Sequence, residues 1–221
     1  MKSAATHPLQ PHPATPCAAV DAVGVTVAFD PAGRLRLTYV LAGDLSRLRL
    51  PAAAAQPGPA DGLWRHTCFE AFVGSDHAPD YREFNFAPSG HWAAYAFSAE
   101  RVPAKLLPPL RSGGGLGWRP AAPKQAQAPL DASPPPSQPS PARGGRGKNH
   151  SAAPHLTCRR DTHTLTLEAL LPLPPSSGPL RLGLSAVIET TDGALSYWAL
   201  AHPAPRPDFH QRAGWTLRLE R

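Results

Sequence analysis

The sequence predicts an all-β protein, an antiparallel β-sandwich of jelly-roll type. About ten short segments alternate apolar and polar residues with a period of two, which is typical of half-buried strands. Turn residues separate these segments at regular intervals, as in sandwich folds. The chain also has 29 prolines and 18 glycines among 221 residues, and these residues interrupt regular structure too often for long helices.

The strands can be placed in order along the chain. The expected strands are residues 23–29, 34–42, 63–73, 81–87, 91–98, 156–160, 165–171, 181–189, 195–201 and 214–219. Asp30-Pro31-Ala32-Gly33 joins the first two, with proline and glycine where a type I turn prefers them.

The turn Ala87-Pro88-Ser89-Gly90 predicts a register. Pro88 fixes φ at a negative value, so a primed two-residue hairpin turn is excluded, and a type I turn with Gly90 in the left-handed region fits instead. The resulting loop pairs Ala87 with His91, Asn85 with Ala93 and Glu83 with Tyr95. Tyr95 then joins the polar side of the hairpin, and Trp92 points toward the core with Phe86.

The chain divides into a tail, one domain and an insertion. Residues 1–18 form a tail rich in Pro and Ala without periodicity, and residues 19–220 form a single sandwich. The Pro/Gly/Ser-rich segment at about 112–153 interrupts that domain; we expect it to be disordered, because it cannot bury enough apolar surface to offset its ordering entropy. A basic, proline-rich interaction arm is the alternative interpretation of this insertion.

Charge and composition exclude several classes of function. The net charge is +6, but residues 119–150 contribute +4 of it, from Arg119, Lys124, Arg143, Arg146 and Lys148 against Asp131. The remaining chain is nearly balanced, which argues against a nucleic-acid-binding surface. Three cysteines without a close pair signal neither a disulfide framework nor a zinc site. No signal-peptide core and no apolar run of spanning length occur, so we expect a soluble, cytoplasmic protein without membrane contact.

Polar side chains on alternating positions predict a binding face. Glu83 and Asn85 share one side of their strand and offer carboxylate and amide groups suited to ligand hydroxyls. On the preceding strand, Trp64, His66 and Glu70 point one way, together with Cys68. Trp64 could stack on a flat ligand or close the core, and Glu70 could contact a ligand or pair with Arg82. Tyr95 adds an aromatic hydroxyl to the same side.

No catalytic arrangement is recognisable. The carboxylates Glu70 and Glu83 could in principle serve glycoside hydrolysis, but the sequence shows no Ser/His/Asp arrangement, nucleophile elbow or phosphate-binding glycine loop. His66 with Cys68 is a weak signal for a metal or haem. Near the C-terminus, Trp198 could pack in the core or contact a ligand, and His210 lies in a polar loop where we expect it to be exposed.

Three runs of the sequence resemble a known family. They are Leu63-Trp-Arg-His-Thr-Cys-Phe-Glu-Ala-Phe72, the run from Tyr81 to Tyr95, and Leu195-Ser-Tyr-Trp-Ala-Leu-Ala-His-Pro203. They are similar to bacterial DOMON-like domain proteins, whose relatives include the family 9 carbohydrate-binding modules. The resemblance implies a jelly-roll sandwich that binds sugar or haem without catalysis. It also implies sugar contacts from Trp64 and Glu70, with Trp198 as the second tryptophan of a clamp.

The sequence therefore predicts a non-catalytic protein that binds a small ligand, with a carbohydrate or sugar derivative as the leading class. Its candidate contacts are Trp64, His66, Glu70, Glu83, Asn85, Tyr95, Trp198 and His210. No metal or cofactor is expected. The alternatives are a DOMON-type domain that binds haem or another cofactor through His66 or His210, and a protein-interaction module. The haem-binding relatives use Met and His ligands, whereas the only methionine here is Met1.

Overall fold

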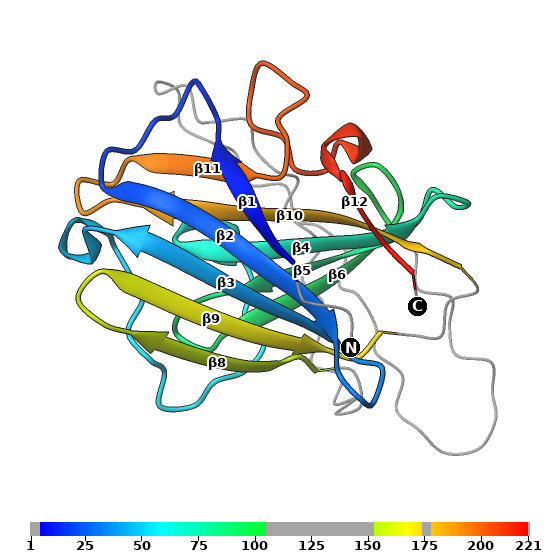
Figure 1. Ribbon diagram of the computed structural model, residues 1–221, viewed down its shortest axis with the longest axis horizontal. Helices are drawn as coiled ribbons and strands as arrows, with labels where there is room; N and C mark the ends of the chain where they lie inside the picture. The colour runs from blue at the N-terminus through cyan, green and yellow to red at the C-terminus, as the bar shows by residue number, and fades with distance from the viewer. Residues whose placement is uncertain (1–4, 105–152, 174–177, 221) are drawn as a thin grey trace, which may run out of the picture.

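Two antiparallel sheets face each other in the computed structural model, which describes residues 5–104, 153–173 and 178–220. The strands follow the order β7-β6-β5-β4-β10-β11-β1-β2-β3-β9-β8, and β12 pairs with β10 outside this path. β1 joins the two sheets, because it pairs with β11 on one side and with β2 on the other. In Figure 1 the layer of β2, β3, β9 and β8 lies in front of the layer containing β10, β4, β5 and β6. The predicted all-β sandwich is confirmed.

The first sheet contains β1 (Thr6–Pro11), β2 (Val20–Phe29), β3 (Leu35–Gly43), β9 (Thr164–Leu171) and β8 (His155–Arg160). The second contains β4 (Cys68–Ser75), β5 (Tyr81–Phe86), β6 (Trp92–Ala99), β7 (Val102–Pro103), β10 (Leu180–Glu189), β11 (Leu195–Ala199) and β12 (Leu217–Leu219). Three short 3-10 segments, η1 (Leu45–Arg47), η2 (Leu63–Arg65) and η3 (Arg212–Gly214), are the only helical turns in the part of the chain that the structure describes. No helix there is long and apolar enough to cross a membrane.

The main core lies between the two sheets. Alternate residues of β3, including Leu37 and Tyr39, are completely buried against Phe69 and Ala71 of β4 and their neighbours on β10 and β9. The Tyr39 hydroxyl donates a hydrogen bond to the Glu70 carbonyl oxygen at 2.7 Å, which ties the first sheet to the second. Each large side chain buried here stabilises the fold by about 1.5–3 kcal/mol.

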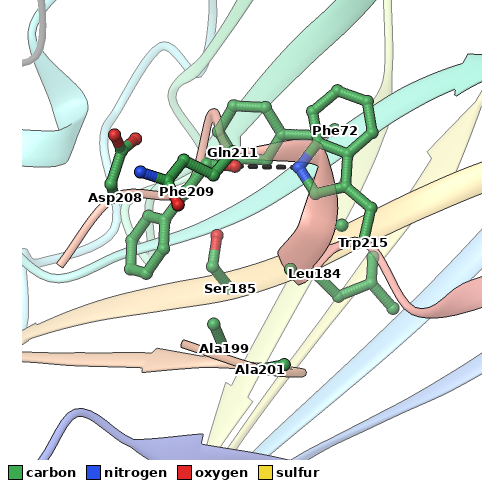
Figure 2. A pocket seen from close by; sticks show the side chains of 11 residues that line it. Phe72, Leu184, Ser185, Ala199, Ala201, Asp208, Phe209, Gln211 and Trp215 are labelled. Atoms are coloured by element: carbon green, nitrogen blue, oxygen red, sulfur yellow. Dashed lines mark hydrogen bonds between the residues drawn. The ribbon is translucent and has the colours of Figure 1, made fainter. Parts of the chain in front are cut away.

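A second apolar cluster lies on the opposite face of the second sheet. Its buried members are Phe72, Tyr81, Phe97, Val187, Ala199, Phe209 and Trp215. The chain that follows β11 supplies Phe209 and Trp215, and the Trp215 indole N–H donates to the Phe209 carbonyl oxygen at 2.9 Å (Figure 2). Gly183 of β10 lets the Trp215 ring lie flat on the sheet, because a Cβ at that position would be 2.3 Å from Trp215 Cδ1. This C-terminal segment therefore covers a face that would otherwise meet solvent.

The predicted hairpin is confirmed in detail. Gly90 has φ +88°, and its N–H donates to the Ala87 carbonyl oxygen at 2.9 Å. The register pairs Asn85 with Ala93 and Glu83 with Tyr95, as the turn chemistry indicates. Trp92 is partly buried against the main core, on the Phe86 side.

Three expectations need correction. The prediction that residues 1–18 lack regular structure is wrong for Thr6–Pro11, which forms β1. Leu9 is buried in this strand, and pairing with two strands offsets the missing N–H groups of the prolines.

The strand expected at 63–73 begins only at Cys68, because Leu63–Arg65 turns as η2 after Gly62 in the left-handed region (φ +74°). Trp64 and His66 therefore do not share a strand face with Glu70. The predicted insertion at about 112–153 lies, except for its last residue, outside the described residues.

Candidate functional site

The predicted site residues occupy three different places. Glu70, Glu83 and Asn85 lie on the outward side of the second sheet with His210 above them, and we call this group with Tyr81 and Ser185 the polar face. Trp64, His66 and Tyr95 lie at one end of the same sheet. Trp198 lies in the main core on the opposite face, so it does not form a clamp with Trp64.

The centre of the polar face is a row of three residues on adjacent strands. Glu70 pairs with Asn85 of β5 and with Ser185 of β10, and all three side chains are buried. The Ser185 hydroxyl donates to Glu70 Oε2 at 3.5 Å. Glu70 Oε1 and Asn85 Oδ1 accept no hydrogen bond from the described residues. Two buried acceptors on directly paired residues are costly unless a donor reaches them.

Burial decides the protonation of these carboxyls. Burial raises the pKa of Glu70 well above its usual range, and the negative charge of Glu83 raises it further. Burial also raises the pKa of Glu83 to about 7, although the bond from Asn85 and the charge of Arg101 act in the opposite direction. Asn85 Nδ2 donates to Glu83 Oε1 at 2.8 Å. Burial therefore favours the protonated form of Glu70, whose O–H would be a donor close to Asn85.

His210 joins the polar face to the C-terminal segment. Contrary to the expected exposure, its side chain is 2% exposed, because it packs edge-on against Phe72 and Phe97. Its Nδ1 lies 2.6 Å from the Tyr81 hydroxyl, and its Nε2 lies 3.6 Å from Glu83 Oε2. Burial lowers the pKa of His210 to about 4, with a further contribution from a nearby arginine. The imidazole is therefore neutral at pH 7 and serves as a connecting hydrogen-bond group.

An aromatic pair borders the polar face. Trp64, half-buried in η2, meets the ring of Tyr95 edge-on with ring centres 5.9 Å apart. The Tyr95 hydroxyl donates to Asp61 Oδ1 at 2.6 Å, which connects β6 to the segment that precedes η2. Tyr95 itself pairs with Glu83, so the aromatic pair adjoins the buried carboxyls.

An open cavity of about 380 Å³ lies beside this pair, where β4 begins and β5 ends; we call it the end cavity. It is lined by Pro51, Asp61, Gly62, Leu63, Arg65, His66, Thr67, Ala87 and Ser89. Glu189 is buried behind His66 and accepts a hydrogen bond from His66 Nδ1 at 2.7 Å. It also forms an ion pair with Arg49 at 3.1 Å. The Glu189 carboxylate therefore fixes the orientation of the His66 ring at the cavity.

A second hollow, between the C-terminal segment and the second sheet, is too small for an organic ligand. Ser185 and Ala199 form its floor, and Phe209 and Trp215 close it from above (Figure 2). Its volume is about 10 Å³, which is room for about one water molecule at most. This hollow is a packing gap of the second apolar cluster.

Trp198 has a structural position. It is buried in the main core, and its indole N–H donates to the Ser196 hydroxyl oxygen at 3.1 Å. Glu70 has no ion pair with Arg82, since the two side chains project from opposite faces of the sheet and Arg82 is exposed.

Several site residues could not be identified from the sequence. Ser185 and Tyr81 read as ordinary strand residues, and Glu189 is separated from His66 by more than one hundred positions. Among the residues that the sequence analysis did not name as candidates, Asp61 could have been suspected, because it begins the sequence run that also contains Trp64. Within residues 5–104, 153–173 and 178–220, no three His, Cys, Asp or Glu side chains are grouped so that they could hold a metal ion.

Comparison with known proteins shows a structural likeness at low sequence identity. A "putative carbohydrate-binding protein" from Bacteroides uniformis, whose crystal structure was solved at 2.70 Å, matches with a TM-score of 0.56 and 13% identity. The match covers 96% of this chain and 84% of that protein. No protein-family model matches the chain, and no curated protein sequence matches it. The two proteins share a fold, and the likeness to DOMON-like proteins and family 9 modules rests on the sequence runs alone.

Proposed function

We propose that this protein binds a carbohydrate or sugar derivative at the end cavity without transforming it. The observation that supports this most is the open cavity beside the half-buried Trp64, with acidic, basic and hydroxyl groups in its lining. The Bacteroides uniformis protein of the same fold is named a "putative carbohydrate-binding protein", which favours the same ligand class.

The end cavity has the size and chemistry that a sugar requires. Small-ligand sites typically have volumes of about 300–1,000 Å³, and the cavity falls within this range. Sugars combine hydroxyl groups with one apolar ring face. The Asp61 carboxylate can accept hydrogen bonds from hydroxyls, and the His66 imidazole and the Ser89 hydroxyl can also form them. Trp64 does not line the cavity, but it stands between the lining residues Leu63 and Arg65 in the chain and offers a flat surface for stacking.

The residues of the polar face lie near the end cavity but do not line it. Glu70 and Asn85 are fully buried, so a ligand in the cavity does not touch them in this conformation. Asn85 is two residues from the lining residue Ala87, and Glu70 is three residues from the lining residue Thr67, which correspond to about 7 and 10 Å along the strands. We assign direct ligand contact to Trp64, His66 and Tyr95, and a positioning role to Glu70, Glu83, Asn85 and His210.

The burial of the two carboxyls also favours binding over hydrolysis. A glycosidase needs one carboxyl group to protonate the leaving oxygen and a second to act on the opposite side of the sugar. Glu70 and Glu83 lie on one face of one sheet, and neither reaches the end cavity.

A thermal-shift screen of the full chain against mono- and oligosaccharides tests the proposal, with haem as a separate arm. A saccharide at about one hundred times its dissociation constant should stabilise the protein by about 2.7 kcal/mol. Trp64→Ala should abolish the shift and lower the melting temperature of the free protein less than a core substitution does, because Trp64 belongs to neither apolar cluster. A matched control is Trp92→Ala, a tryptophan packed against the main core, which should lower the melting temperature but keep the shift.

If haem shifts the melting temperature and no saccharide does, the ligand is haem or a similar cofactor and not a carbohydrate. If no compound shifts the melting temperature, the cavity is not a small-molecule site, and a protein-interaction module becomes the better interpretation.

A further inference from the structure

We infer that the sugar bound at the end cavity carries an anionic group, a carboxylate or a phosphate, and that Arg65 holds this group. This inference rests on the proposed function and adds the chemical class of the ligand. It follows from the charges around the cavity and from the partners that each charged group already has.

The carboxylates near the cavity are already engaged. Asp61 is the only acidic residue in the cavity lining, and its Oδ1 accepts from the Tyr95 hydroxyl at 2.6 Å and from the Gly62 N–H at 2.9 Å. Glu189 accepts from Arg49 at 3.1 Å and from His66 at 2.7 Å. The charge of Arg49 is thereby matched by Glu189.

Arg65 is the arginine of the cavity lining, and it shares this lining with one carboxylate, Asp61. It is exposed at the cavity, at the last position of η2, and its guanidinium forms no ion pair with the residues that the structure describes. The side chain lies back over Gly62, since a Cβ at Gly62 would be 3.8 Å from Arg65 Nε. Its stem is therefore held at the cavity, and the fork of N–H donors suits the paired oxygens of a carboxylate or phosphate.

His66 supplies the complementary contact. Because the Glu189 carboxylate accepts the bond from Nδ1, Nε2 is the ring nitrogen left to form a hydrogen bond with a sugar hydroxyl. Arg65 and His66 are adjacent in the chain and line the same cavity, so together they match a ligand that carries an anion and a hydroxyl group close to each other.

The test is calorimetric titration of the full chain with matched ligands. The probes are glucose, glucuronate and glucose 6-phosphate, and the corresponding galactose series, each at low and at high sodium chloride. A charge-assisted contact to Arg65 should make the anionic member bind about tenfold to a hundredfold more tightly than the neutral sugar. This preference should shrink with salt, because Arg65 is exposed and its charge is screened.

Arg65→Gln should remove the tenfold to hundredfold preference for the anionic ligands and change the affinity for the neutral sugar by a smaller factor. Arg82→Gln is the matched control, because Arg82 is an exposed arginine on β5 away from the cavity; it should keep the preference. Uronates and sugar phosphates are separate arms, so the stronger of the two identifies the anionic group.

The outcomes distinguish this inference from the proposed function. Equal affinity for neutral and anionic sugars, or an unchanged preference in Arg65→Gln, would overturn the inference and leave carbohydrate binding standing. Absence of binding by every sugar of both series and by the saccharides of the thermal-shift screen would overturn both.

Discussion

The buried carboxyl of Glu83 predicts a specific dependence of stability on pH. Its pKa is about 7 in the folded protein, against 4.5 for a free glutamate side chain. A raised pKa means that the folded state binds the proton more tightly than the unfolded chain does. The contribution of Glu83 to stability is therefore fully present below pH 4.5 and is lost as pH rises through 7.

The magnitude follows from the two pKa values. They differ by about 2.5, and each unit is worth about 1.4 kcal/mol, so the whole effect is about 3 kcal/mol. Most of it falls between pH 5 and pH 8, because the unfolded side chain is already mostly ionised at pH 5. His210 acts in the opposite direction: its pKa is lowered to about 4, so its contribution is lost as pH falls below 6.5.

Glu83→Gln isolates the carboxyl. The amide oxygen can still accept the bond from Asn85, and the variant has no proton to lose. Measured by urea unfolding, the free energy of unfolding of the variant minus that of the wild type should rise by roughly 2–3 kcal/mol from pH 5 to pH 8. Glu168→Gln, a change at an exposed carboxyl of β9, should follow the wild type. A difference that stays constant with pH for Glu83→Gln would refute the reasoning, because it would mean that the carboxyl does not bind its proton more tightly in the folded state.

Three further predictions test other parts of the structure. Gly183→Ala should cost about 1–3 kcal/mol in urea unfolding, because its Cβ would meet the Trp215 ring at 2.3 Å; an unchanged stability would show that the ring does not lie there. The exposed Cys158 should react with a thiol reagent in the folded protein and the buried Cys68 only after unfolding, as peptide mass spectrometry would report; equal rates would contradict the placement of Cys68. Trp198→Ala should destabilise the protein by about 3–5 kcal/mol but keep saccharide affinity, because Trp198 lies in the main core. Loss of saccharide affinity at unchanged stability would mean that Trp198 contacts the ligand.

The strands and one hairpin were predictable because their signals are local. Period-two alternation located all ten predicted strands, and the fixed φ of Pro88 together with the freedom of Gly90 determined the register of Glu83 with Tyr95. β1 was not predictable in this way. Its prolines suggested a tail, and only the two neighbouring strands that it joins explain why it is ordered.

The candidate site was predictable only in part, because burial depends on distant segments. Alternation correctly placed Glu70 and Asn85 on the side of the sheet away from the main core, where a sandwich normally meets water. The C-terminal segment covers part of that side, and nothing near Glu70 in the sequence indicates that Phe209 or Trp215 will pack there. The same long-range packing buries His210.

The location of the ligand is the central claim, and backbone amide chemical shifts of the full chain test it most directly. On titration with the saccharide that stabilises the protein most, the perturbed amides should cluster at residues 61–67 and 87–91, with Tyr95 beside them. In Trp64→Ala the same titration should leave these amides unmoved. Perturbations concentrated on β8 and β9, at the far edge of the first sheet, would contradict the assignment of the end cavity as the binding site.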